Sequence, residues 1–176
     1  KYEGAGLFFA SSKDGGAAYA EARLASDNTC ECCRLGLAFA GPGRPVVVFR
    51  NLFEGGVRDH AVMTFADPAT PGEVRRVSND DWHISACPHH GPSLSISPAG
   101  TYHVSWYTNG KARKGLFYAR SQDEGRTFSD PLPLGRADRP RVGWYGDMEM
   151  QSHAWTLLCS GPLGVTIAVS EPVPLS

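Results

Sequence analysis

Short apolar runs alternate with turn-forming residues along most of the chain. Residues 7–10, 45–49, 62–66 and 116–119 are four such runs, and aromatic or β-branched side chains are frequent in them. Each run is much shorter than the roughly ten or more residues that an amphipathic helix needs. Short β-rich runs separated by Gly, Pro, Asp and Ser are typical of strands and tight turns. The pattern therefore predicts an all-β protein.

A turn motif occurs twice in the chain. Residues 12–19 and 121–128 both read Ser-x-Asp-x-Gly-x-x-aromatic, and both follow an apolar run. Asp and Gly favour tight turns, so each copy predicts a strand, a turn and a second strand that begins at the aromatic residue. Residues 62–68 and 165–172 retain the strand pattern but have lost the turn residues. The four copies recur about every fifty residues, which is typical of a repeat architecture.

A second repeated unit lies between the turn motifs. Residues 34–50 and 91–107 each combine an alternating strand, a Gly/Pro turn and a β-rich strand, and the offset from Gly43 to Gly100 is 57 residues. Each period then holds four strands, two from this hairpin and two around the Asp turn. Four antiparallel strands in a repeat of this length predict a β-propeller blade. Residues 17–25 have a helix-like composition, but they begin inside a turn motif, so we interpret them as a closing strand and its connection.

A β-sandwich is the alternative fold, because its turns also recur regularly, about every 8 to 12 residues. A sandwich has no reason to repeat at about fifty residues, so we favour the propeller. The 176 residues supply three to four four-stranded blades, near 7–29, 30–86, 87–140 and 141–176. Propellers typically have about 4 to 8 blades. We therefore expect a partial propeller in a single domain, completed by remaining blades of the same polypeptide or by a second protein chain.

The two turn motifs resemble the Asp boxes, also called bacterial neuraminidase repeats, of sialidase-like β-propellers. The copy at residues 121–128 fits that pattern fully, and the copy at 12–19 has Ala18 where Thr is usual. The resemblance implies a fold, with the boxes as structural turns on the outside of the blades and away from the axis. The residues in this structural role are Ser12, Asp14, Gly16, Tyr19, Ser121, Asp123, Gly125, Thr127 and Phe128.

Composition narrows the classes of partner. The 17 Lys+Arg are balanced by 18 Asp+Glu, so there is no basic excess to attract nucleic acid. No apolar run approaches the roughly 18 residues that a membrane-spanning helix needs, so we expect no membrane span. The 20 Gly and 13 Pro fit many short strands joined by turns.

Four of the five cysteines lie in two clusters. Cys30-Glu-Cys-Cys and Cys87-Pro-His-His stand 57 residues apart, the same offset as the hairpins that they precede. Equivalent positions in adjacent blades would place both clusters beside the inner strands, near the propeller axis. Thiolates and imidazoles suit copper(I) or zinc, whereas calcium and magnesium need carboxylate-rich sites. The candidate metal ligands are Cys30, Cys32, Cys33, Cys87, His89 and His90.

Two other roles are open for these cysteines. A disulfide could join Cys30 or Cys32 to Cys87 across neighbouring blades, and an oxidising compartment would favour it. Free thiols are the third alternative. We expect the protein to be exported, either to the periplasm or out of the cell.

Arginines form a second candidate site. Arg34 follows the first cysteine cluster, Arg50 ends an apolar strand, and Arg58 precedes Asp59. Because a guanidinium can bind a carboxylate through two parallel hydrogen bonds, this group could bind an acidic sugar or another anion. The alternative for Arg58 and Asp59 is a surface ion pair. Sialidases bind the substrate carboxylate with three arginines, but their Phe/Tyr-Arg-Ile-Pro segment is missing here, so the resemblance assigns no catalytic residue.

The sequence leaves three functions open. We expect an Asp-box β-propeller that binds a metal ion or an anionic or sugar ligand at its axial face, without catalysis. A sialidase-type glycoside hydrolase with part of its active site on further blades is the first alternative. A structural subunit of a larger assembly is the second.

Overall fold

The computed structural model describes residues 5–31, 33–86 and 88–134, and these residues form β-strands and one short 3-10 turn, Glu54–Gly56. The strands are β1 (Ala5–Phe9), β2 (Arg23–Thr29), β3 (Gly36–Phe39), β4 (Pro45–Arg50), β5 (His60–Asp67), β6 (Thr70–Pro71), β7 (Arg75–Arg76), β8 (Ser93–Ile96), β9 (Tyr102–Asn109), β10 (Lys114–Ser121) and β11 (Leu132–Pro133). The all-β prediction is therefore confirmed for the described part of the chain. The strand predicted at 165–172 and the blade predicted at 141–176 lie outside it. Within the described ranges, no helix has the length and apolar character to cross a membrane.

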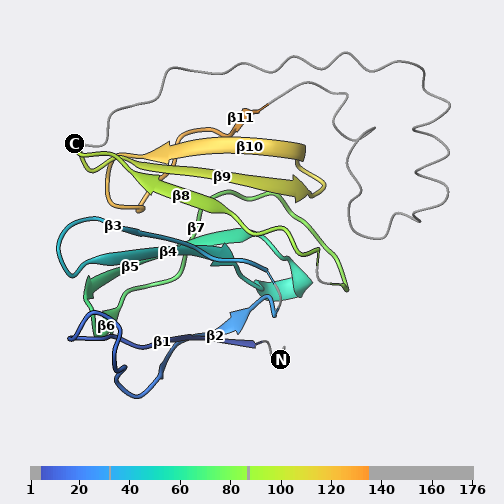
Figure 1. Cartoon of the computed structure of the whole chain (residues 1–176). Coiled ribbons are helices and arrows are strands. Elements are labelled where there is room, and N and C mark those ends of the chain that lie inside the picture. The colour runs from blue at the N-terminus through green and yellow to red at the C-terminus, as the bar shows by residue number, and fades with distance from the viewer. Residues whose placement is uncertain (1–4, 32, 87, 135–176) are drawn as a thin grey trace, which may run out of the picture.

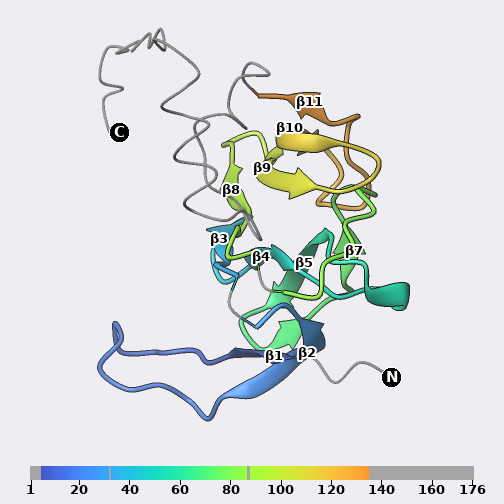
Figure 2. The ribbon, with the colours of Figure 1, turned by 90° about the vertical axis from the view of Figure 1, so that its right-hand side faces the viewer.

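Three antiparallel sheets lie one above another (Figures 1 and 2). The first contains β1 and β2. The second runs β3, β4, β5 and β6, with β7 also paired to β5, and the third runs β8, β9, β10 and β11. Apart from β7, consecutive strands are neighbours within each sheet, so the chain forms a series of meanders, and the second sheet lies between the other two.

The two predicted hairpins have the same register. Gly36 pairs with Val48 in the first hairpin, and Ser93 pairs with Ser105 in the second, so both partners are displaced by the 57 residues seen in the sequence. A glycine with positive φ, 69° in one case and 80° in the other, lies in each connecting turn. The sequence repeat is therefore also a repeat of strand pairing.

Strand β4 is buried on both faces, which explains its continuous apolar sequence. Its alternate side chains enter two separate cores. The core against the third sheet contains Val46, Val48, Val62, Tyr102, Val104 and Trp106. The core against β1 and β2 contains Leu7, Val47, Phe49, Met63 and Phe65. Burial of each large apolar side chain stabilises the fold by about 1.5–3 kcal/mol, so β4 fixes the middle sheet between its neighbours.

Both Asp turns have the same hydrogen bonds. Ser121 Oγ donates to Asp123 Oδ1 at 2.7 Å and accepts from Gly125 N at 2.9 Å, while Asp123 Oδ1 accepts from Thr127 N at 2.9 Å. The corresponding distances in the first turn are 2.6, 2.9 and 3.0 Å. The Thr127 hydroxyl adds a bond to Asp123 Oδ2 at 2.6 Å, and Ala18 has no hydroxyl to do the same. These donors, led by that hydroxyl, lower the pKa of Asp123.

The aromatic residue of each turn does not begin a strand, contrary to the prediction. β2 begins only at Arg23 and β11 only at Leu132, several residues after Tyr19 and Phe128. The returning chain first makes a single backbone bond to the preceding segment, such as Ser129 N to the carbonyl of residue 120 at 2.8 Å, which is too little for a ladder. Phe128 packs against the core, whereas Tyr19 is 67% exposed.

Candidate functional site

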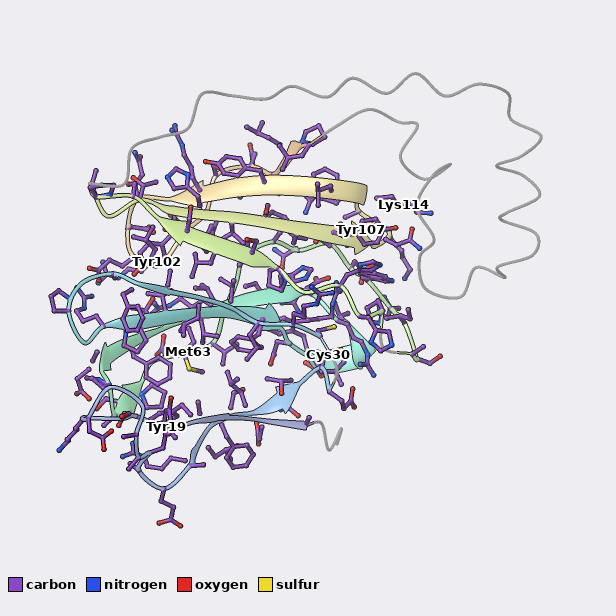
Figure 3. The ribbon with its side chains drawn as sticks, viewed as in Figure 1. Tyr19, Cys30, Met63, Tyr102, Tyr107 and Lys114 are labelled. Atoms are coloured by element: carbon purple, nitrogen blue, oxygen red, sulfur yellow. The ribbon has the colours of Figure 1, made fainter. Side chains whose placement is uncertain are left out.

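Three strand ends meet at Arg50, at one end of the sheets. Arg50 is the last residue of β4 and pairs with His60, the first residue of β5. Cys30 directly follows β2, and its N–H donates to the Arg50 carbonyl at 2.9 Å. Cys30 and Tyr107 of β9 lie toward the same end of the sheets (Figure 3). The residues gathered there, called the cysteine–arginine cluster below, are Cys30, Cys33, Arg50, Arg58 and His90.

The two thiols of the cluster are in contact. The Sγ atoms of Cys30 and Cys33 are 3.2 Å apart, and Arg58 Nη1 donates to Cys30 Sγ at 3.2 Å. The hydrogen bond from Cys33, helped by Arg58, lowers the pKa of Cys30 to about 6, although burial acts in the opposite direction. The same bond raises the pKa of Cys33, because its proton stabilises the neighbouring thiolate. The pair therefore shares one hydrogen bond, with Cys33 as the donor, and this bond favours the thiolate form of Cys30.

Arg50 is only 1% exposed and connects the middle sheet to the third. Its Nη1 donates to the carbonyl of Arg58 at 2.6 Å, and its Nη2 donates to the carbonyls of His90 and Tyr107 at 3.0 and 3.2 Å. Its guanidinium carbon lies 4.3 Å from the centre of the Trp82 ring. Burial lowers the pKa of Arg50, and the neighbouring cysteines oppose that shift. Arg50 therefore uses its terminal nitrogens to hold backbone segments together.

Arg58 and Asp59 are buried, which corrects the alternative of a surface ion pair. They are 7% and 1% exposed. Arg58 Nη1 donates to Glu31 Oε2 at 3.2 Å, in addition to its contact with Cys30. The carboxylate of Asp59 accepts three backbone N–H bonds from residues 80–82, at 3.1 to 3.2 Å. Burial raises the pKa of Asp59, and the hydrogen bonds from those backbone groups oppose this shift. Asp59 thus anchors the loop that leads toward the third sheet.

A buried network continues from that loop. Asp80 is fully buried, and its carboxylate accepts from Ser78 Oγ and from Trp106 Nε1, both at 2.7 Å. Arg113 of the β9–β10 connection forms an ion pair with the same carboxylate. These bonds join the loop at residues 78–80 to β9 and to the β9–β10 connection.

His60 is a buried member of the site that the sequence analysis did not single out. Its side chain is fully buried, its ring centroid is 6.2 Å from that of Trp106, and within the described residues neither ring nitrogen has a hydrogen-bond partner. Burial, followed by the charge of Arg50, holds the pKa of His60 well below 6.5. The ring is therefore neutral. A single His at the start of an otherwise apolar strand is the sequence signal that could have identified it.

Parts of both predicted cysteine clusters lie around Arg50. Cys30 and Cys33 come from the first, and His90 comes from the second, with its ring centroid 4.8 Å from that of Tyr107. Burial lowers the pKa of His90, and the charge of Arg50 adds to this effect.

The other predicted ligands are not part of the cluster as described. His89 is exposed and has a positive φ of 56°, and Arg34 is exposed. Cys32 and Cys87 lie outside the described residues, and so does the disulfide considered for Cys87. In the described ranges, no group of three or more His, Cys, Asp or Glu side chains is arranged to hold a metal ion.

Stacked antiparallel meanders define the described part of the chain as all-β, and a solved structure shares this fold. The chain is similar to the leech intramolecular trans-sialidase in complex with 2,7-anhydro-Neu5Ac, with a TM-score of 0.52 and 16% sequence identity. The match covers 72% of this chain and 19% of the leech chain, so this chain spans about a fifth of that protein. At this identity the likeness concerns the fold alone. No known protein family and no curated protein matches the sequence.

Proposed function

We propose that the chain is a segment of a sialidase-like, Asp-box β-propeller whose cysteine–arginine cluster binds a soft metal ion. The shared hairpin register, the Asp turns and the likeness to the leech trans-sialidase support the propeller. In this proposal the second and third sheets are successive blades, and β1 and β2 are the outer strands of the blade before them. The contact of β3 with β8 then brings two inner strands together, and the cluster lies where both begin.

The contact between the two sulfurs is the observation that carries the metal proposal. Cys30 and Cys33 have the Cys-x-x-Cys spacing that is common among thiolate ligands of one ion. Their Sγ atoms are 3.2 Å apart. With metal–sulfur bonds of about 2.3 Å, they need to separate by about 1.4 Å for a linear two-coordinate ion and by less for a bent one. The thiolate form of Cys30 is also the form that binds metal.

Copper(I) is the ion that we propose for the two sulfurs. Soft thiolates favour copper(I). Two thiolates around a monovalent ion carry one net negative charge, and Arg58 beside Cys30 compensates it in a buried setting.

An anionic or sugar ligand at Arg50 and Arg58 is less favourable. The guanidinium of Arg50 already binds three carbonyls, and that of Arg58 binds Cys30 and Glu31. A carboxylate ligand would have to displace these partners from a buried position, at the cost of unpaired polar groups.

Anaerobic titration of the full chain with copper(I), in competition with a chromophoric copper(I) chelator, tests the metal proposal. We expect one ion per chain, and we expect Cys30→Ser and Cys33→Ser each to weaken binding by more than about tenfold. Cys159→Ser is the matched control and should bind as the wild type does. A wild type that takes up no copper(I), or a Cys30→Ser/Cys33→Ser double variant with unchanged affinity, would contradict the proposal.

A sialidase-type glycoside hydrolase is the second candidate, and the fold likeness is the observation in its favour. The leech protein was determined with a sialic acid derivative, and this chain spans about a fifth of it. The test is hydrolysis of a fluorogenic sialoside by the purified chain. Release of the fluorophore would support this activity, and release no faster than with heat-denatured protein would count against it for these residues.

A further inference from the structure

We infer that Cys30 and Cys33 form a thiol–disulfide exchange site that reacts with low-molecular-mass disulfides such as oxidised glutathione. This chemistry uses the same sulfurs as the proposed copper site, but it does not depend on copper, because it needs only the two thiols and an external disulfide. If the proposed copper site exists, oxidation of Cys30 and Cys33 to a disulfide would release the bound ion, because both sulfur ligands would be lost.

The sulfur positions favour a bond between them. Cys30 and Cys33 have the Cys-x-x-Cys spacing that recurs in disulfide oxidoreductases. Their Sγ atoms are 3.2 Å apart. A disulfide bond is about 2.05 Å long, so the remaining gap is one that side-chain rotation can close.

The two cysteines differ in how firmly they are held and how well they can be reached. Cys30 is 6% exposed, its N–H binds the Arg50 carbonyl, and its sulfur receives a hydrogen bond from Arg58. Cys33 is half-buried in the irregular segment before β3. An external reagent therefore reaches Cys33 first. The exposed Arg34 beside it attracts an anionic disulfide such as oxidised glutathione.

The exchange takes two steps. The Cys33 proton passes along the hydrogen bond to Cys30, and the Cys33 thiolate attacks one sulfur of oxidised glutathione, which forms a mixed disulfide and releases one glutathione thiolate. Cys30 then gives this proton to solvent and attacks Cys33 Sγ as a thiolate, the mixed disulfide breaks, and a second glutathione thiolate leaves. Two electrons pass from the cysteine pair to the external disulfide. Excess reduced glutathione reverses both steps.

Trapping the mixed disulfide tests this order of reaction. The full chain is freed of metal with a chelator and treated with oxidised glutathione, and the modified cysteines are located by tandem mass spectrometry. The wild type should lose two hydrogens through a bond between Cys30 and Cys33 and keep no glutathione there. Cys30→Ser should retain glutathione on Cys33, whereas Cys33→Ser should leave Cys30 unmodified.

Cys32→Ser and Cys87→Ser serve as controls and should form the same internal disulfide as the wild type. Glutathione that stays on Cys33 of the wild type would overturn the inference, and so would a Cys30→Ser variant that forms a disulfide to Cys32 or Cys87 instead.

Partial reduction and differential alkylation of the wild type give an independent result if circular dichroism shows that a serine variant is unfolded. In that case, a disulfide map of the oxidised wild type without a bond between Cys30 and Cys33 contradicts the inference. Because all of these measurements use metal-free protein, failure of copper binding leaves their outcome unchanged, and the two proposals fail separately.

Discussion

Arg50 is the residue on which the geometry of the site depends most. It ends a strand of the middle sheet, and its side chain binds the carbonyl of Arg58 within that sheet's own loop and those of His90 and Tyr107 in the next repeat. The planar guanidinium also stacks on Trp82, which lysine could not reproduce. Arg50 therefore fixes the loop between β4 and β5 and also the junction between the second and third sheets.

Replacing Arg50 with Met should lower the free energy of unfolding by about 3–5 kcal/mol, because it leaves buried carbonyls without their charged donor. Chemical denaturation followed by circular dichroism measures the change. Arg120→Met, at an exposed arginine of β10, is the matched control and should lie within about 0.5 kcal/mol of the wild type. Equal effects of the two substitutions would show that Arg50 does not have this structural role.

His60 makes stability depend on pH. Its pKa is held well below 6.5 by burial and by Arg50, so the unfolded chain binds a proton more readily than the folded chain does. Stability from this group is therefore complete above about pH 6.5 and is lost as the pH falls below that value, by up to about 1.4 kcal/mol per pH unit.

Denaturation of the wild type and of His60→Phe between pH 7 and pH 5 checks this dependence. The wild type should lose stability across the interval, and His60→Phe should lose less. His89→Asn, at an exposed histidine whose positive φ suits Asn, should lose as much stability across this interval as the wild type does. Parallel curves for the wild type and His60→Phe would rule out His60 as the source.

At the residue scale, the sequence identified the members of the site better than their roles. The sequence pattern indicates Cys30, Cys33, Arg50, Arg58 and Asp59 as candidates, and these residues lie close together. Their partners were not predictable, because the arginines bind backbone carbonyls and thiols whose positions depend on packing between sheets that are far apart in sequence.

The Asp turns are the elements with the most direct relation between sequence and geometry. Asp123 accepts from the backbone and hydroxyl groups of Thr127 and from Ser121, all within its own turn. Asp123→Ala should therefore lower the Tm in a thermal melt followed by circular dichroism. Asp14→Ala should lower it less, because Ala18 gives that turn one hydrogen bond fewer.

Asp130→Ala is the control for the Asp turns, since Asp130 is an exposed residue outside the motif. It should leave the Tm unchanged. Copper(I) binding should be the same in all three variants, because the turns lie outside the cysteine–arginine cluster. A loss of binding with an unchanged Tm would mean that the turn has another role.

At the element scale, the sequence predicted the strands and hairpins that depend on residues close together in the chain. The hairpins of β3–β4 and β8–β9 and the strands β5 and β10 follow from alternating apolar residues and Gly/Pro turns. The start of β2 and β11 did not follow, because pairing there depends on where the returning chain meets the neighbouring strand. The aromatic residues of the two turns were also not predictable from local pattern. Phe128 packs against a core, whereas Tyr19 is largely exposed.

At the scale of the whole molecule, the first sheet of the described residues has fewer strands than the other two. It has two strands, and a groove with a volume of about 520 Å³ opens between it and the middle sheet, lined mainly by apolar residues including Leu7, Phe9, Leu37, Phe39, Val47 and Phe65. Leu37 and Phe39 of β3 are each 61% exposed in this groove. In the next repeat, β8 and β9 cover the opposite face of the middle sheet.

Light scattering of the isolated 176-residue chain, combined with thermal unfolding, is the most direct test that these sheets are blades of an incomplete propeller. Exposed apolar faces and strand edges associate readily in water. The account predicts that the chain self-associates or aggregates, burying well over the roughly 1,600 Å² of a standard interface if it forms a defined assembly. A soluble, stable monomer that unfolds in one cooperative transition would contradict it and would favour a β-sandwich.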